Sequence, residues 1–174
     1  MLKYNYTAKR DDYLTPPEII KEVLTSTGFT EFDCDTCCSL DNIPAKFRYR
    51  KDGLYSAKNN KLSESNGLNG TWFPYNWCNP PFSICEDFVK KAVAEQKKGH
   101  TTYMLIPART ETKYWHDYIL DENGGTNRWD VKVKFLRKGI CFLNPDNDEK
   151  MSVYKNSLAL VTFLGHTTTE VLDA

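Results

Sequence analysis

The chain has 174 residues, of which 40% are hydrophobic and 26% charged, a composition typical of one soluble globular domain rather than of a disordered chain. Lysine plus arginine equals aspartate plus glutamate, 23 against 23, which argues against tight non-specific binding to long nucleic acids. The sequence contains no apolar run of about 18 residues and no signal-peptide core near its start. We therefore expect a cytoplasmic protein without a membrane partner.

The six cysteines raise the question of metal binding or disulfide bonding. Cys34 and Cys37 have C-x-x-C spacing, which leaves a zinc site as an alternative, but no second such pair and no H-x-x-x-H motif follows. In a cytoplasmic chain, reduced and mostly buried thiols are the expected state. We therefore predict no metal site.

The first predicted elements in chain order are an arm over residues 1–12 and a helix over about 16–27. Thr15 and Glu18 have the spacing of a capping box, and Gly28 is a typical residue to end a helix. We expect a single domain over residues 13–174 after the arm.

Later elements follow from apolar runs and from residues that favour turns. A polar stretch rich in asparagine and glycine, about 55–71, predicts an exposed loop or insertion. A second capping box, Ser83 with Glu86, and Gly99 frame a further helix. The predicted strands lie near 32–35, 45–50, 71–78, 101–107, 130–136 and 157–164, with 139–143 as a candidate partner of 130–136, and the helices lie near 84–98 and 112–120.

This order of strands and helices predicts an open α/β sheet of mixed strand direction with helices on both faces. In such sheets, ligands gather at the carboxyl ends of the strands. Asp35, Asn79 and Arg109 each follow a predicted strand, so all three are candidates for a site at that edge.

The motif Asn79-Pro80-Pro81-Phe82 lies between a predicted strand and a predicted helix, where active-site loops are common. The exocyclic amine of an aromatic base is a poor nucleophile because its lone pair is delocalised into the ring. Two rigid acceptors, the Asn79 side-chain oxygen and the Pro80 carbonyl, can free that lone pair and stabilise the charge that develops on nitrogen. Phe82 can stack on a base that has left its helix. A tight proline turn with Phe82 in the core is the structural alternative.

The motif resembles the catalytic motif of amino-group methyltransferases that use S-adenosylmethionine. Further segments are similar to the small phage-type DNA adenine-N6 methyltransferases (Dam-like) and occur in the same order between residues 11 and 164. These segments are DDYLTPPEII, FDCDTCCSLDN, KDGL, WCNPPFS and LIPARTETKYWHD. The resemblance implies a Rossmann-like methyltransferase fold, S-adenosylmethionine as cofactor, DNA (double-stranded by expectation) as substrate, and a phage-encoded enzyme in a bacterial cytoplasm.

The resemblance also implies site residues. The catalytic group is Asn79, Pro80, Pro81 and Phe82, and the cofactor-binding group is Thr15, Pro16, Asp35, Cys37, Asp52, Leu54 and Asn79. Arg109 is suited to a phosphate of the target strand, and Lys46 and Arg48 open a basic cluster that is either a phosphate-facing rim or a solvated face. The usual glycine-rich turn after the first strand is replaced by DTCCS.

Several alternatives remain open at the level of sequence. Asp35 and Asp52 also fit ordinary turns, and Arg109 fits a structural ion pair. The same motif serves an RNA adenine or a protein glutamine amide, and the missing glycine turn also fits a non-catalytic relic of the fold. The stretch between Asp41 and Thr71 is too short for a separate target-recognition domain, which usually needs at least about 50 residues.

Overall fold

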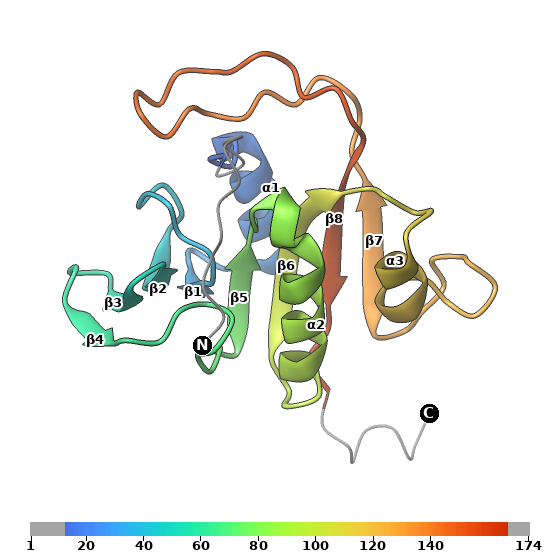
Figure 1. The fold of residues 1–174 in the computed structure, drawn as a ribbon, viewed down its shortest axis with the longest axis horizontal. Coiled ribbons are helices and arrows are strands. Elements are labelled where there is room, and N and C mark those ends of the chain that lie inside the picture. The colour runs from blue at the N-terminus through green and yellow to red at the C-terminus, as the bar shows by residue number, and fades with distance from the viewer. Residues whose placement is uncertain (1–12, 167–174) are drawn as a thin grey trace.

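The computed structural model describes residues 13–166, and its strands form one sheet (Figure 1). The predicted arm at 1–12 lies outside the described residues. The eight strands have the order β4-β3-β2-β1-β5-β6-β8-β7. Their bounds are Phe32–Asp35 (β1), Ala45–Arg50 (β2), Gly53–Ser56 (β3), Lys61–Ser63 (β4), Tyr75–Cys78 (β5), Thr101–Pro107 (β6), Val131–Phe135 (β7) and Leu158–Phe163 (β8).

The centre of the sheet is parallel and both of its edges are antiparallel. Strands β2, β1, β5 and β6 run in one direction, whereas β3 and β4 alternate at one edge and β8 and β7 alternate at the other. The prediction of an open α/β sheet of mixed direction is therefore confirmed. The parallel centre brings the carboxyl ends of β1, β2, β5 and β6 to one edge, which we call the carboxyl edge.

Helices cover both faces of this sheet. Helix α1 (Pro17–Thr27) packs with Leu105 of β6, whereas α2 (Cys85–Gln96) and α3 (Lys113–Tyr118) pack with its neighbours Met104 and Ile106 on the opposite face. The alternation follows from the two-residue period of a strand. Figure 1 shows α1 behind the sheet, and α2 and α3 in front of it. No helix within residues 13–166 is long and apolar enough to cross a membrane.

Both helices with a predicted capping box begin differently. The residue before α1 is Pro16, with no side-chain cap, so the prediction of Thr15 as the cap is wrong. A proline at the first helical position supplies a suitable φ and has no N–H to satisfy, which makes a side-chain cap dispensable. A short 3₁₀ turn, η1 (Phe82–Ile84), leads into α2, so Ile84 rather than Ser83 precedes that helix. Gly28 ends α1 with φ 74°, as predicted.

The predicted exposed loop at 55–71 instead contains the end of β3 and all of β4. Edge strands are short and polar, which removes the alternation that sequence analysis relies on. The rest of the stretch is partly buried: Trp72 Nε1 donates to the Gly67 carbonyl at 2.7 Å, and a Cβ at Gly67 would lie 1.9 Å from the Thr36 carbonyl oxygen. Only glycine fits at this contact between the loop and the end of β1.

The predicted pairing of 139–143 with 130–136 is wrong, because β7 pairs with β8. Residues 136–157, which we call the strap, connect β7 to β8 and extend over the carboxyl edge in Figure 1. Leu143 of the strap forms isolated β-bridges with Leu14 and Lys150 instead. The strap is thus tied to the segment just before α1.

Candidate active site

The carboxyl edge brings together the strand-end residues that the sequence singled out. Asp35 is the last residue of β1, and Asn79 follows β5, which pairs directly with β1. Arg109 follows the end of β6, the next strand in the sheet. The parallel register therefore places all three at one edge.

A small cavity links Asp35 with Asn79. Its volume is about 10 Å³, enough for roughly one water molecule. Of the predicted site residues, Thr15, Asp35, Cys37 and Asn79 line it. The remaining lining residues are Tyr13, Leu14, Ser39, Asn42, Ile43 and Trp77. Pro16, the neighbour of Thr15, is buried at the start of α1.

The Asn79 amide is held in one orientation. Its Nδ2 donates to the Tyr13 carbonyl oxygen at 2.7 Å. Its Oδ1 has no hydrogen-bond partner among residues 13–166 and remains an acceptor. Pro80 and Pro81 are buried, and the Ile84 N–H bonds to the Pro81 carbonyl at 3.1 Å rather than to that of Pro80. The turn is thus rigid while one side-chain acceptor stays available.

Phe82 does not offer an open face for stacking. Its side chain is 8% exposed, and its ring is surrounded by those of Tyr13, Phe142 and Tyr154, with centroid distances of 6.0, 5.9 and 5.5 Å. We call these four rings the aromatic box. In this structure the Phe82 ring packs against the other three rings of the box, which differs from its predicted role as the surface that stacks on the base.

Asp35 is a buried carboxylate with little compensation. It is 3% exposed, and its Oδ1 accepts from the Cys37 N–H at 3.2 Å. Burial raises the pKa of Asp35 to about 7, although that hydrogen bond and the nearby Arg48 charge act in the opposite direction. A cation that entered the small cavity would favour its ionised form.

The two basic residues assigned to nucleic acid are placed differently from that prediction. Lys46 lies near the start of β2, away from the carboxyl edge, and pairs with Asp33 at 2.7 Å. Arg48 is 8% exposed, and it donates to the Ile43 carbonyl at 3.2 Å. Its Nε lies 3.5 Å from Asp41 Oδ1. Because Arg48 braces the loop between β1 and β2 from inside, it is unavailable to a phosphate.

Asp52 lies beside a second hollow at the end of β2, with a volume of about 230 Å³. This hollow is lined by Cys38, Ser39, Arg50, Lys51 and Asp52. Ser39 also lines the small cavity, so the two spaces meet at the loop between β1 and β2. Asp52 Oδ2 accepts from the Tyr55 hydroxyl at 2.7 Å. Leu54 lines neither space and packs against the core instead.

Arg109 is exposed and has no ion pair among residues 13–166, so a structural salt bridge does not account for it. Its carbonyl accepts from the Thr112 hydroxyl at 2.7 Å, which fixes the start of α3. The Trp115 side chain is fully buried and donates to the Pro107 carbonyl at 3.2 Å. Trp115 therefore packs α3 against the core of the sheet.

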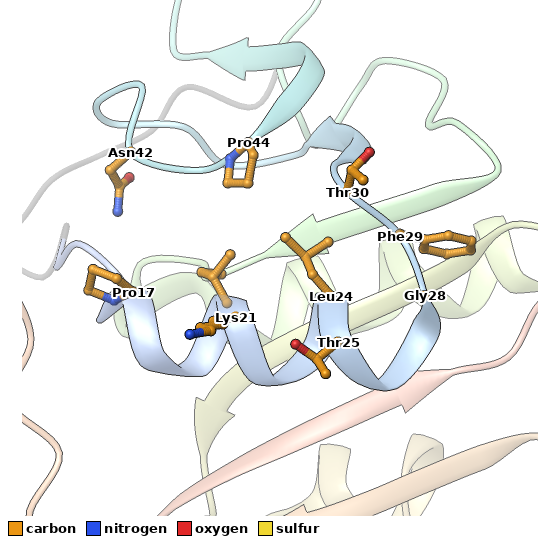
Figure 2. Close-up of a pocket in the computed structure, with 10 residues that line it drawn as sticks. Pro17, Lys21, Leu24, Thr25, Gly28, Phe29, Thr30, Asn42 and Pro44 are labelled. Atoms are coloured by element: carbon orange, nitrogen blue, oxygen red, sulfur yellow. The ribbon is translucent and has the colours of Figure 1, made fainter.

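A larger apolar groove of about 560 Å³ lies between α1 and the loop that enters β2. Figure 2 shows Leu24 of α1 extending toward the loop that carries Pro44, on the other side of the groove. Residues 36–44 connect the parallel strands β1 and β2 without a helix, although such crossovers usually contain one. None of the predicted site residues lines the groove.

Sequence reasoning did not identify Tyr13, Asn42, Phe142 or Tyr154 as site residues. Asn42 Nδ2 donates to the Thr15 carbonyl at 3.3 Å and joins the two segments that flank the small cavity. Phe142 and Tyr154 come from the strap, which carries no motif. Tyr13 lies in the DDYLTPPEII segment and Asn42 ends the FDCDTCCSLDN segment, and these positions were the usable signals.

Comparison with known proteins supports the resemblance. Residues 4–170 match the family model described as DNA N-6-adenine-methyltransferase (Dam). The chain is also 32% identical over 109 residues to the DNA N-6-adenine-methyltransferase of Escherichia phage T1. That alignment covers 62% of this chain and 40% of the phage protein, so the chain spans less than half of that relative's length. The chain belongs to the Dam family of DNA N-6-adenine methyltransferases.

Proposed function

We propose that this protein transfers the methyl group of S-adenosylmethionine to the N6 amine of an adenine in double-stranded DNA. The observation that carries the proposal is the fixed orientation of the Asn79 side-chain amide. It is fixed through Nδ2 by the Tyr13 carbonyl, and its Oδ1 is left as an acceptor beside the buried Asp35. Family membership supports DNA adenine as the substrate.

The sheet supports a Rossmann-like methyltransferase fold. It has a parallel centre followed by two antiparallel strands, and its last strand in sequence, β8, inserts between β6 and β7. The candidate residues cluster at the carboxyl edge, where open α/β sheets bind ligands.

The residues at this edge fit the cofactor. When bound, S-adenosylmethionine supplies an activated methyl group on a sulfonium. The Asp35 carboxylate, buried with little compensation, suits the positively charged amino-acid end, with Thr15, Pro16 and Cys37 around it. Asp52, in the adjoining hollow, suits the adenosine end because a carboxylate accepts hydrogen bonds from hydroxyls and amines. The small cavity holds only about one water molecule, so ligand binding has to widen it.

The chain's own contribution to the reaction is positioning and charge stabilisation. Asn79 Oδ1 accepts one hydrogen of the target amine, and the Pro80 carbonyl accepts the other. Both acceptors belong to a turn whose two prolines limit its movement. They stabilise the positive charge that builds on nitrogen as the new N–C bond forms, and the surplus proton leaves afterwards. No side chain has to remove a proton before the methyl group moves.

The test is to identify the modified base. Adenine-methylation-free DNA is incubated with the protein and isotope-labelled S-adenosylmethionine, digested to nucleosides, and analysed by mass. We expect label in N6-methyl-2′-deoxyadenosine from DNA, with little label in RNA or protein offered in parallel. Label in a cytosine nucleoside would overturn the choice of base. Label only in RNA or glutamine would overturn the substrate class, and failure to bind the cofactor at all would overturn methyl transfer.

A further inference from the structure

The strap reaches the candidate active site and is fixed there by backbone bonds. The N–H of Leu14 donates to the Leu143 carbonyl at 3.1 Å, and the Leu143 N–H donates back to the Leu14 carbonyl at 3.0 Å. Leu14 lies between Tyr13, whose carbonyl holds Asn79, and Thr15, which lines the small cavity. The strap is therefore coupled directly to the residues that orient the catalytic amide.

Two aromatic rings of the strap complete the aromatic box. The Phe142 ring stacks on that of Tyr13, with centroids 5.3 Å apart and an angle of 29° between the planes. The Tyr154 ring meets Phe142 edge-on at 5.5 Å and meets Phe82 at 5.5 Å. Aromatic residues from three separate segments thus converge next to the Asn79 turn.

A cavity of about 460 Å³ opens against this box. This volume lies within the range of roughly 300–1,000 Å³ that is common for small-molecule sites. Its lining residues are Tyr13, Phe142, Met151, Ser152, Val153, Tyr154, Lys155 and Asn156. Tyr13 also lines the small cavity beside Asn79, so the two spaces adjoin at this residue. The larger space combines aromatic walls with polar groups at its rim, as a nucleobase requires.

Basic side chains lie exposed near both ends of the strap. They are Arg137, Lys138 and Lys155, and none has an ion pair among residues 13–166. Lys134, on the preceding strand, pairs with Glu22 instead. Exposed cations beside an aromatic cavity provide the two components that bind nucleic acid strands, which are phosphate attraction and base stacking.

We infer that the strap is the element that binds the target nucleotide, and that the 460 Å³ cavity receives the extruded base. Tyr154, whose side chain is partly exposed, supplies the stacking surface, while Lys138 and Lys155 contact the flanking phosphates. Because Tyr13 lines both cavities, it has to shift for the base amine to meet Asn79 Oδ1. This inference rests on the proposed function and assigns its substrate-binding element.

The experiment compares Tyr154→Leu with Tyr75→Leu, a matched substitution of an exposed tyrosine at the start of β5, distant from the strap. The methylated site is first mapped with the wild-type protein, and a duplex with 2-aminopurine at that position then reports base stacking by fluorescence. We expect Tyr154→Leu to raise KM for DNA by roughly tenfold or more, as expected for loss of one stacked base. It should also change the fluorescence of the bound probe, whereas Tyr154→Phe and Tyr75→Leu behave like wild type.

A second pair of variants tests the phosphate contact without touching the aromatic box. Lys155→Glu should weaken DNA binding and flatten its salt dependence, whereas Lys97→Glu, at the end of α2, should not. If the wild-type protein transfers methyl groups but Tyr154→Leu and Lys155→Glu behave like their controls, the inference alone is overturned. Absence of methyl transfer by the wild-type protein would instead overturn the proposed function, and this inference with it.

Discussion

Asp35 and Glu95 are both buried carboxylates, but their surroundings differ in kind. Glu95 is fully buried on α2, and it accepts from Lys91 at 2.6 Å, Lys98 at 2.8 Å and His100 at 2.9 Å. Burial raises its pKa, but these hydrogen bonds outweigh that effect and hold the pKa at about 2. For Asp35, burial prevails and raises the pKa to about 7. The charge of Glu95 is compensated by neighbouring cations of the fold, whereas a charge on Asp35 is not.

The difference separates a structural carboxylate from one available to a ligand. Leaving a buried acid without full compensation costs stability, so folds normally pair such groups. Asp35 lines a cavity next to Asn79, where a positively charged ligand can complete the pairing. Strongly perturbed acids in clefts are common at functional sites, whereas paired ones such as Glu95 usually serve the fold.

The largest expected effect is the loss of stability on substitution of Glu95, the paired carboxylate. Glu95→Gln leaves the two lysines without their shared partner, and we expect the free energy of unfolding to fall by about 3 kcal/mol. Chemical denaturation monitored by circular dichroism measures it. Glu86→Gln is the matched control, because its surface pair with Lys90 should contribute only about 0.5 kcal/mol. Equal effects of the two substitutions would show that the Glu95 cluster is not structural.

Substitution of Asp35 should affect cofactor binding rather than the free energy of unfolding. Asp35→Asn removes an acid whose folded-state pKa is raised, so it should not destabilise the protein near pH 8. It should nevertheless weaken S-adenosylmethionine binding by about tenfold, which corresponds to the loss of roughly one charge-assisted hydrogen bond. Isothermal titration calorimetry and denaturation on the same preparations give both quantities. A loss of stability with unchanged cofactor affinity would reverse the comparison.

The pH dependence of stability sharpens the contrast between the two acids. Between about pH 4 and 7 the folded state holds a proton on Asp35 that the unfolded chain has lost, so this group's contribution makes stability fall as pH rises through that window. Glu95 acts with the opposite sign, since its stabilisation is present above the ordinary glutamate pKa of 4.5 and is lost as pH falls toward about 2. Denaturation curves of wild type, Asp35→Asn and Glu95→Gln at several pH values separate the two contributions.

The smallest expected effects concern cations at the surface, one with an ion-pair partner and one without. Arg109→Ala removes a charge at the carboxyl edge that no residue within 13–166 pairs, and we expect KM for DNA to rise about fivefold, the value of one phosphate contact. Lys46→Ala removes a lysine that already pairs with Asp33 near the start of β2, and it should leave KM unchanged. Filter binding and steady-state kinetics at fixed salt make the comparison. A larger effect from Lys46 would restore it to the DNA-binding surface.

The parts of the structure that sequence predicted are those with strong local signals. Apolar runs identified the central strands, and the carboxyl-edge rule brought Asp35 and Asn79 to one site. The edge strand β4 was missed because a polar strand at a sheet edge lacks a buried face. The sequence did not reveal that Arg48 is buried or that Lys46 is paired, because a cluster of cations in sequence shows neither property. The strap was missed because its contacts with Tyr13 and Phe82 are long-range and leave no periodic pattern.

The central claim is that Asn79 activates the amine and does not merely hold the fold together. Its most direct test is single-turnover methyl transfer by Asn79→Ala, with cofactor and DNA binding measured on the same sample. Asn123→Ala, an exposed loop substitution, serves as control. We predict a fall of the transfer rate by about 10²–10³-fold with both affinities nearly unchanged, the loss typical of one transition-state hydrogen bond. A variant that still transfers methyl at the wild-type rate would contradict the account.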